Sequence, residues 1–223
     1  MTQKKANARP ALAQGDSTEA KLLDAGMALF GELGFKATTT RMIADRAGAN
    51  IGSIAYYFGN KRGLYLAIAE HIGQHLKEKL GIAQLFAEAP PADELSPVLA
   101  LELLNQLANK MIDLFACDRE AEKWLMVIMR EQVNPTEAFE HLYKNAFLQV
   151  HSTLSFLISR LMKRSAEEDE VLMETHFLVG RIVFLLVGKT PLLRRLGQTG
   201  GYSEETVVLA KGVMARHLRQ LVN

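Results

Sequence analysis

The sequence predicts an all-α fold of about nine helices, because its apolar residues follow helical spacing. Leu, Ala, Met, Glu, Lys and Arg recur at spacings of three and four residues, whereas alternating apolar runs are hard to find. The composition, 48% hydrophobic and 23% charged, is close to the globular average and argues against wholesale disorder. A chain of 223 residues is long enough for one large domain or two small ones with a buried core.

The N-terminal segment predicts a polar arm followed by a first helix. Residues 1–15 contain no apolar stretch, so we expect a disordered basic arm there and not a secretory signal. Asp16 or Ser17 can cap the helix, and Gly34 is a helix-stop signal.

Two short helices are predicted next. Thr39 or Thr40 can cap the first of them, which ends at Gly48. Asn50 can cap the second, over residues 51–58, because its side-chain oxygen can accept a backbone N–H of the following turn.

The rest of the chain predicts a series of longer helices. A helix begins near Lys61, and a Pro-rich break over residues 87–97 follows it. Five further helices are expected near residues 97–117, 119–132, 135–164, 168–188 and 203–221. Asn134 is the expected cap of the third, with Pro135 in its first helical position, and Ser203 is the expected cap of the last.

Charge and cysteine content exclude several classes of protein. The net charge is +1, and the mild excess of Lys and Arg over residues 1–75 gives only weak support for nucleic-acid binding. Cys117 is the sole cysteine, so no intrachain disulfide is possible, which suits the cytoplasm. The most apolar run, Phe177–Gly188, is too short to span a bilayer and contains Arg181, so we expect no membrane insertion.

No enzyme motif is present. The sequence lacks GxSxG, a P-loop, GxGxxG and paired cysteines, and we expect no cofactor. His71 and His75 have the spacing of a zinc protease helix, but Ile72 stands where the general-base glutamate would be. We therefore expect neither a catalytic residue nor a metal site.

Three consecutive aromatic residues, Tyr56, Tyr57 and Phe58, occupy the second short helix. Consecutive residues fan across roughly 200° of a helix, so these rings cannot all enter one core. Ile54 and Phe58, four residues apart, form the expected buried stripe, which leaves both tyrosines to project outward. The glycine-containing turn between the two short helices is typical of a helix-turn-helix, whose second helix enters the DNA major groove.

The stretch TTTRMIADRAGANIGSIAYYFGNKRGLY, Thr38–Tyr65, resembles the DNA-binding domain of the TetR family of transcriptional regulators. The resemblance implies a DNA-binding domain over residues 16–77 and a helical ligand-binding and dimerisation domain over residues 78–223. It implies DNA contacts from Thr39, Thr40, Asn50, Ile51, Gly52, Ser53, Tyr56, Tyr57 and Lys61. Ile51 and Ala55 depart from the polar or aromatic residues of many members, and each change removes a possible DNA contact.

The C-terminal half is similar to the CecR-type branch of the same family, on the stretches REQVNPTEAFEHLY and HFLVGRIVFLLVGKTPLLRRLG. The family resemblance implies a small-molecule effector that releases the protein from DNA. Methionine and tryptophan can shape an adaptable apolar pocket, although core packing explains the same residues equally well. Candidate effector contacts are Trp124, Met126, Met129, Arg130 and His141.

Two helices near the C-terminus carry apolar stripes that predict a homodimer interface. Glycine lets helices approach closely and phenylalanine supplies large buried area, so these stripes can pack into a four-helix bundle. The expected interface residues are Phe177, Gly180, Phe184 and Gly188 on one helix and Val207, Met214, Leu218 and Leu221 on the other. The alternative is that both stripes belong to the core of the monomer.

The leading hypothesis is a cytoplasmic, ligand-responsive repressor that binds a near-palindromic operator in double-stranded DNA as a homodimer. An all-helical enzyme is a second hypothesis, and it requires an acid-base or metal cluster that the sequence does not assemble. A helical interaction module without DNA binding is a third. The tyrosine pair and Lys61 argue against that third hypothesis.

Overall fold

The computed structural model describes residues 17–222, and within that range the chain forms helices and no strands, which confirms the predicted fold class. The arm expected over residues 1–15, and Asp16, lie outside the described residues. The α-helices are α1 (Thr18–Ala37), α2 (Thr40–Ala47), α3 (Gly52–Phe58), α4 (Lys61–Leu80), α5 (Ile82–Leu85), α6 (Pro97–Cys117), α7 (Arg119–Val133), α8 (Glu137–Leu142), α9 (Leu148–Met162), α10 (Asp169–Val187), α11 (Lys189–Leu196) and α12 (Glu204–Arg219). A 3-10 turn, η1 (Ala92–Glu94), precedes α6, and a π-helical turn, η2 (Tyr143–Phe147), joins α8 to α9.

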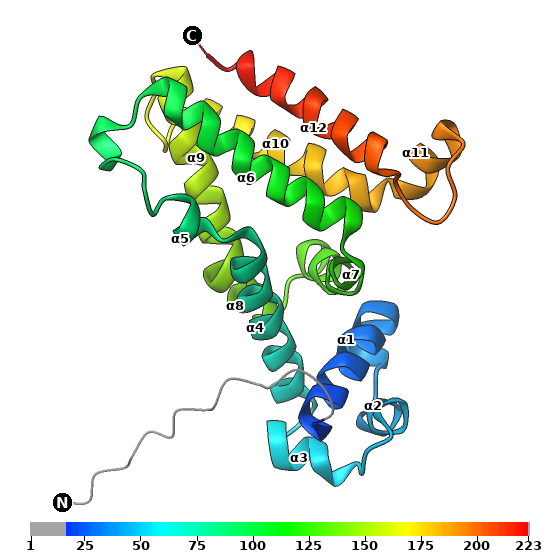
Figure 1. Ribbon diagram of the computed structural model, residues 1–223. Coiled ribbons are helices and arrows are strands. Elements are labelled where there is room, and N and C mark those ends of the chain that lie inside the picture. Colours follow the sequence, from blue (N-terminus) through cyan, green and yellow to red (C-terminus); the bar gives the residue numbers. More distant parts are fainter. Residues whose placement is uncertain (1–16, 223) are drawn as a thin grey trace, which may run out of the picture.

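The first three helices and the start of α4 form a small bundle at one end of the molecule (Figure 1). Side-chain caps start α1, α2 and α4: Ser17 accepts the Ala20 N–H, Thr39 accepts the Met42 N–H, and Asn60 accepts the Gly63 N–H. Each bond satisfies a backbone donor that the first helical turn leaves without an intrahelical partner.

Glycines end the same helices. Gly34 has φ 83° and breaks α1 before its last residues, and Gly48 has φ 61° at the end of α2. Such positive φ values favour glycine because it has no Cβ. The helix stops expected from the sequence are therefore confirmed at both positions.

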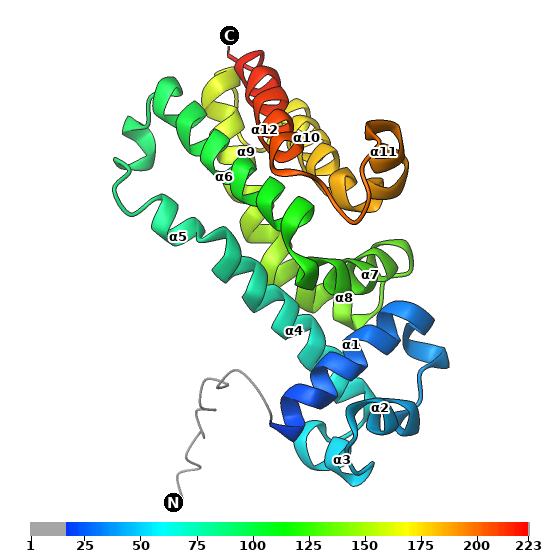
Figure 2. The same cartoon turned by 45° about the vertical axis from the view of Figure 1, so that its right-hand side comes forward.

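Helix α4 connects the two ends of the molecule. It starts beside α3 and runs continuously past residue 77, the expected domain boundary, into the larger helical body (Figure 2). One face of α4 packs in the small bundle through Leu64 and Ile68, and Leu76 and Leu80 are buried further along. A single rigid helix thus belongs to both parts of the chain.

The larger body consists of α6, α9, α10 and α12, with α7 and α8 placed between them and the small bundle. The helix expected over residues 135–164 is interrupted, because η2 separates α8 from α9. Asn134 was the wrong cap: Thr136 accepts the Ala138 N–H and starts α8, while Asn134 ends α7. The sequence also gave no indication of the short helices α5 and α11.

Within residues 17–222, no single helix is long and apolar enough to cross a membrane. In this described part of the chain, only α10 and α11 taken together are long and apolar enough, and a 69° bend separates them.

Candidate DNA-binding surface and effector cavity

Helix α3 is positioned by the turn that precedes it. The Asn50 side-chain oxygen accepts the Gly52 N–H at 2.8 Å, and the Asn50 carbonyl accepts the Ser53 N–H at 2.9 Å. Ile54, 1% exposed, fixes the helix on the core of the small bundle. The opposite face of α3 therefore points away from the protein.

The three consecutive rings of α3 separate as their helical spacing requires. Tyr56 is 83% exposed, while Tyr57 and Phe58 are half-buried and pack against the core. The Tyr56 and Tyr57 rings meet edge to face with centroids 4.9 Å apart. Tyr56 is thus held outward by its neighbour, and Tyr57 is less exposed than the sequence predicts.

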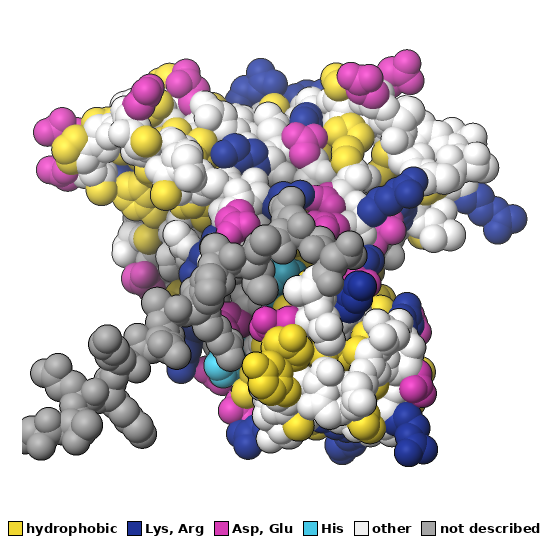
Figure 3. Space-filling view, turned by 60° about the horizontal axis from the view of Figure 1, so that its bottom comes forward, with side chains coloured by type: hydrophobic (Ala, Val, Ile, Leu, Met, Phe, Trp, Pro, Cys, Tyr) yellow, Lys and Arg dark blue, Asp and Glu magenta, His cyan; other side chains and the backbone are white. Residues whose placement is uncertain are grey.

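The nine expected DNA contacts gather at the free end of the small bundle, on α2, on α3, in the turns beside them and at the first residue of α4. Thr39, Asn50, Ile51 and Gly52 are exposed, and Thr40 and Ser53 are half-exposed. Figure 3 brings this end forward and shows Lys and Arg side chains around its edge, with Asp and Glu side chains between them. A surface of hydroxyls, an amide and surrounding cations can contact phosphate oxygens and base edges.

Lys61 has a structural role that the sequence did not indicate. Its Nζ donates to the carbonyl oxygens of Phe35 at 2.9 Å and Thr38 at 2.8 Å, and lies 4.4 Å from the Phe35 ring centre. The ammonium group therefore joins the start of α4 to the last turn of α1 and to Thr38, the residue that follows α1. It has three hydrogens, so one is left for a phosphate oxygen.

Two further residues of this end were missed. Arg41 is exposed on α2, directly after Thr40. Gly63 lies against the end of α3, where a Cβ would overlap the Phe58 carbonyl oxygen. A glycine three residues after a helix cap is the only sequence signal for this close approach.

Helix α7 contacts the small bundle through Arg130. Its Nε donates to the Gly31 carbonyl at 2.8 Å, and a terminal nitrogen donates to the Glu32 carbonyl at 2.6 Å. These carbonyls lie near the end of α1, where the helix dipole favours a positive charge. Arg130 was expected to contact an effector, but its guanidinium instead holds α1 against α7.

The next residue, Glu131, makes a second link. Its carboxylate is 2% exposed and accepts the Tyr65 hydroxyl of α4 at 2.6 Å. It also accepts the N–H of Thr136 at 2.9 Å, and the Thr136 hydroxyl. A buried carboxylate requires such partners, so α7 and α4 are tied at this point.

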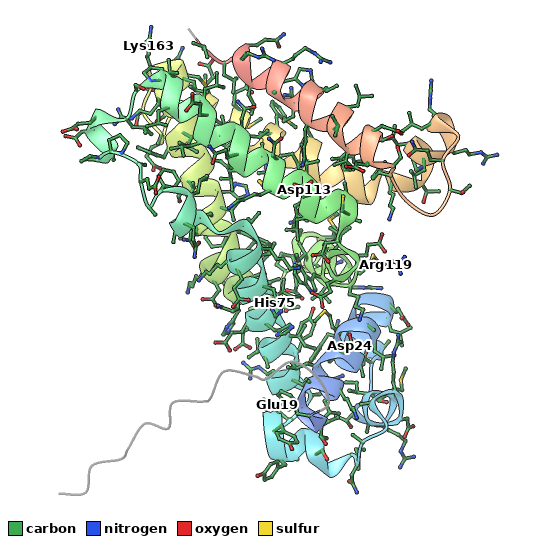
Figure 4. The ribbon with its side chains drawn as sticks, in the orientation of Figure 1. Glu19, Asp24, His75, Asp113, Arg119 and Lys163 are labelled. Atoms are coloured by element: carbon green, nitrogen blue, oxygen red, sulfur yellow. The ribbon has the colours of Figure 1, made fainter. Side chains whose placement is uncertain are left out.

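Lys123 and Asp24 form an exposed ion pair that also joins α7 to α1, and Figure 4 places Asp24 on the side of α1 near α7. His75, labelled in the same view on α4, packs edge to face on Trp124 with ring centroids 5.6 Å apart. Because Trp124 is buried in this contact, its ring belongs to the junction between the helices.

A cavity of about 90 Å³ lies within the larger body, beside α7. It is lined by Leu76 and Leu80 of α4, Met111 and Phe115 of α6, Leu125, Ile128, Met129 and Gln132 of α7, Phe147 of η2, Val150 and His151 of α9, and Val179 and Val183 of α10. Of the five expected effector contacts, Met129 lines this cavity. Trp124, Met126, Arg130 and His141 do not.

Trp124 and Arg130 are described above, and Met126 and His141 also lie away from the cavity. Met126 is exposed on α7, and its side chain faces Gly31, whose missing Cβ lets α1 and α7 approach. His141 is half-buried on α8. From the sequence, His151 was one of three histidines that could line a cavity and was interpreted instead as a satisfied or exposed side chain, because one histidine on a helix specifies no chemistry. Gln132 was missed.

The expected dimer residues divide between the surface and the core. On α10, Phe177 and Gly180 are exposed, and Phe184 is 64% exposed. Gly188 is buried, and the Phe184 ring occupies the place where its Cβ would lie. Three of the four residues expected on α10 are therefore exposed within the protomer.

The stripe expected on α12 was wrong at three positions. Val207, Met214 and Leu218 are buried within the protomer, where α12 packs on α6, and Leu221 is half-buried against the same core. The exposed apolar residues of α12 are Val208 and Leu209. The stripe chosen from the sequence is the one that holds α12 in its own subunit.

Among residues 17–222, no group of three or more His, Cys, Asp or Glu side chains is arranged to hold a metal ion. The His71 and His75 rings are tilted against each other at 45°, with centroids 4.1 Å apart. The His75 Nδ1 lies 3.1 Å from the His71 carbonyl oxygen, so the His75 side chain contacts the backbone of its own helix, α4.

An exposed short helix after a glycine turn, attached to a larger helical body with an internal cavity, defines a two-domain helix-turn-helix regulator of transcription. Residues 22–68 match the family model described as bacterial regulatory proteins, tetR family. Residues 100–222 match the C-terminal domain of the HTH-type transcriptional dual regulator CecR. The chain belongs to the TetR family, which confirms the resemblance, and it is a transcription regulator and not an enzyme.

Among curated relatives, the dual regulator CecR of Shigella flexneri is 34% identical over 90% of this chain and 89% of its own. The regulator BetI of Paraburkholderia xenovorans is 31% identical over 41% of this chain and 47% of its own. Among solved structures, AibR in complex with isovaleryl coenzyme A and operator DNA has a TM-score of 0.66 at 14% identity, covering 91% of this chain and 99% of AibR. The fatty acid degradation regulator FadR of Bacillus halodurans has a TM-score of 0.61 at 16% identity, covering 92% of this chain and 96% of its own.

Proposed function

We propose that this TetR-family regulator is a cytoplasmic repressor that binds a near-palindromic operator as a homodimer and is released by a small-molecule effector. The outward face of α3, with Tyr56 at its centre, is the observation that carries the DNA-binding part. The proposed contacts are the nine expected residues, with Arg41 added as a phosphate contact.

The homodimer proposal rests on the exposed apolar residues of α10 and α12, two helices that both pack on α6 (Figures 1 and 2). Large exposed apolar patches of this kind mark interaction sites. The revised interface comprises Leu172, Met173, Phe177, Gly180, Phe184 and Val187 of α10 with Val208 and Leu209 of α12. A twofold axis there would set two α3 helices about one DNA turn apart, roughly 34–36 Å.

The effector proposal rests on the cavity and on three consecutive residues of α7. Met129 lines the cavity, while Arg130 and Glu131 hold α1 and α4. A ligand that displaces α7 would therefore act directly on both helices that support α3. Release from DNA then follows if the ligand favours a geometry in which the two α3 helices no longer match successive major grooves.

DNA binding is tested by fluorescence anisotropy with a fragment from upstream of the protein's own gene. Tyr56→Phe should weaken binding to this fragment and to random DNA alike, because a phosphate contact carries no sequence information. Ser53→Ala should change sequence preference instead. Wild-type protein that binds neither DNA would overturn the proposal, and a reporter gene on the same fragment distinguishes repression from activation.

A further inference from the structure

The cavity beside α7 has a lining without a single Lys, Arg, Asp or Glu side chain. The charged residues that follow Met129 on α7 turn away from it. Arg130 donates to carbonyls of α1, and Glu131 accepts from Tyr65 and Thr136. An ionised ligand group in this cavity would have no opposite charge beside it, which is strongly unfavourable.

Two polar side chains interrupt the apolar lining. Gln132 is exposed, and His151 is half-buried among the lining residues of α9. Within residues 17–222, the His151 imidazole has no hydrogen-bond partner, so both ring nitrogens are available to a ligand. Burial, and then the nearby His176, lower the pKa of His151, which favours the neutral ring.

The volume indicates a compact ligand. An apolar cavity of about 150 Å³ in another protein admits benzene, whereas this cavity is about 90 Å³. Met111 and Met129 line it, and unbranched methionine side chains adapt readily to a guest. A flat molecule of one or two rings is larger than the ligand-free cavity, so it enters only if Met111 and Met129 move aside.

From the lining, the volume and the unpaired imidazole, we propose that the effector is a compact, uncharged, mostly apolar molecule with one hydrogen-bonding group, and that His151 and Gln132 hold that group. This inference rests on the proposed function of the cavity as the effector site. It assigns the polar contact with the effector to His151 and Gln132, whereas the sequence suggested Arg130 as a contact.

The test uses indole, a flat apolar molecule with one N–H donor, and its anionic relative indole-3-carboxylate. Calorimetric titration of the wild-type protein should give an affinity for indole at least ~100-fold higher than for the carboxylate, because the carboxylate enters unpaired. Val179→Trp or Val183→Phe, which fill the cavity, should abolish indole binding. Val98→Trp, at an exposed position of α6, is the control and should bind indole normally.

The polar anchor is tested with benzothiophene, which has the shape of indole without its N–H. In His151→Leu, the preference for indole over benzothiophene should fall roughly 2–10-fold, the range of one net hydrogen bond. An unchanged preference would remove His151 from the site.

Two outcomes would overturn the inference as a whole. A carboxylate that binds as tightly as indole, and is blocked by Val179→Trp, would keep the cavity as a ligand site but reject a neutral ligand. Indole binding that is absent in wild type, or that survives both filling variants, would reject the cavity as the site. DNA binding by ligand-free protein is measured separately, so failure of the regulator proposal is distinguishable from both.

Discussion

The Tyr65 hydroxyl of α4 donates a 2.6 Å hydrogen bond to the Glu131 carboxylate of α7, and both side chains are buried. Burial, together with the Glu131 hydrogen bond, raises the pKa of Tyr65, so its hydroxyl stays protonated and remains a donor at physiological pH. This bond joins the helix that starts beside α3 to the helix that lines the cavity.

Tyr65→Phe should therefore lower the free energy of unfolding by about 1.5–3 kcal/mol, the range for hydrogen bonds to charged groups. Urea unfolding measures this change. Tyr56→Phe removes an exposed hydroxyl and should leave the unfolding free energy within about 0.5 kcal/mol of wild type. Equal stabilities for the two variants would show that the Tyr65–Glu131 bond contributes nothing net.

Arg130→Met should loosen the end of α1, because it removes both donors from the Gly31 and Glu32 carbonyls. Backbone amides over residues 31–38 should exchange with solvent roughly tenfold faster, as expected for about 1.4 kcal/mol of lost local stability. Mass-spectrometric hydrogen exchange measures this, with Arg216→Met on the exposed face of α12 as the control. Unchanged exchange would remove Arg130 as the link between α7 and α1.

Lys61→Met should destabilise the small bundle by about 1.5–3 kcal/mol, because two carbonyls lose a charged donor. If Lys61 also contacts a phosphate, the slope of log affinity against log salt should fall by about one per half-site. The two effects are independent, and thermal unfolding and salt-dependent DNA titrations measure them separately. A destabilised variant with an unchanged slope would leave Lys61 as a structural link alone.

Gly63→Ala should reduce operator affinity at least ~10-fold while the helical content stays unchanged. The added Cβ would overlap the Phe58 carbonyl oxygen, so the end of α3 must shift relative to α4, and small displacements of a recognition helix misplace its base contacts. Glu70→Ala, at an exposed position of the same helix, should bind the operator like wild type. Wild-type affinity in Gly63→Ala would show that the α3–α4 junction adjusts without cost.

Phe184→Glu should convert the proposed dimer to a monomer, because it places a charge in the apolar face of α10. Phe184 is exposed within the protomer, so the subunit should keep its fold, whereas Leu218→Glu in the core should unfold it. Light scattering and circular dichroism measure these outcomes. Wild-type protein that is monomeric at micromolar concentration would refute the dimer and, with it, the near-palindromic operator.

Much of the local structure follows from the sequence. The caps at Ser17, Thr39 and Ser203 and the stops at Gly34 and Gly48 depend on residues within one turn, so short-range rules place them correctly. The exposure of Tyr56 follows from helix geometry once Ile54 is buried. Helix α11 was missed because Pro191 suggests a break, although proline is tolerated in a first helical turn.

The tertiary structure decided everything that depends on a distant partner. Helix α12 is apolar at both Val207 and Val208, so periodicity alone does not determine which of the two faces α6 and which faces solvent. Arg130 binds α1 about one hundred residues away in sequence, and no local pattern distinguishes that role from effector binding. An apolar stripe on a helix predicts that this face is buried. Whether it packs on another helix of the same subunit or on a second subunit depends on how the whole chain folds.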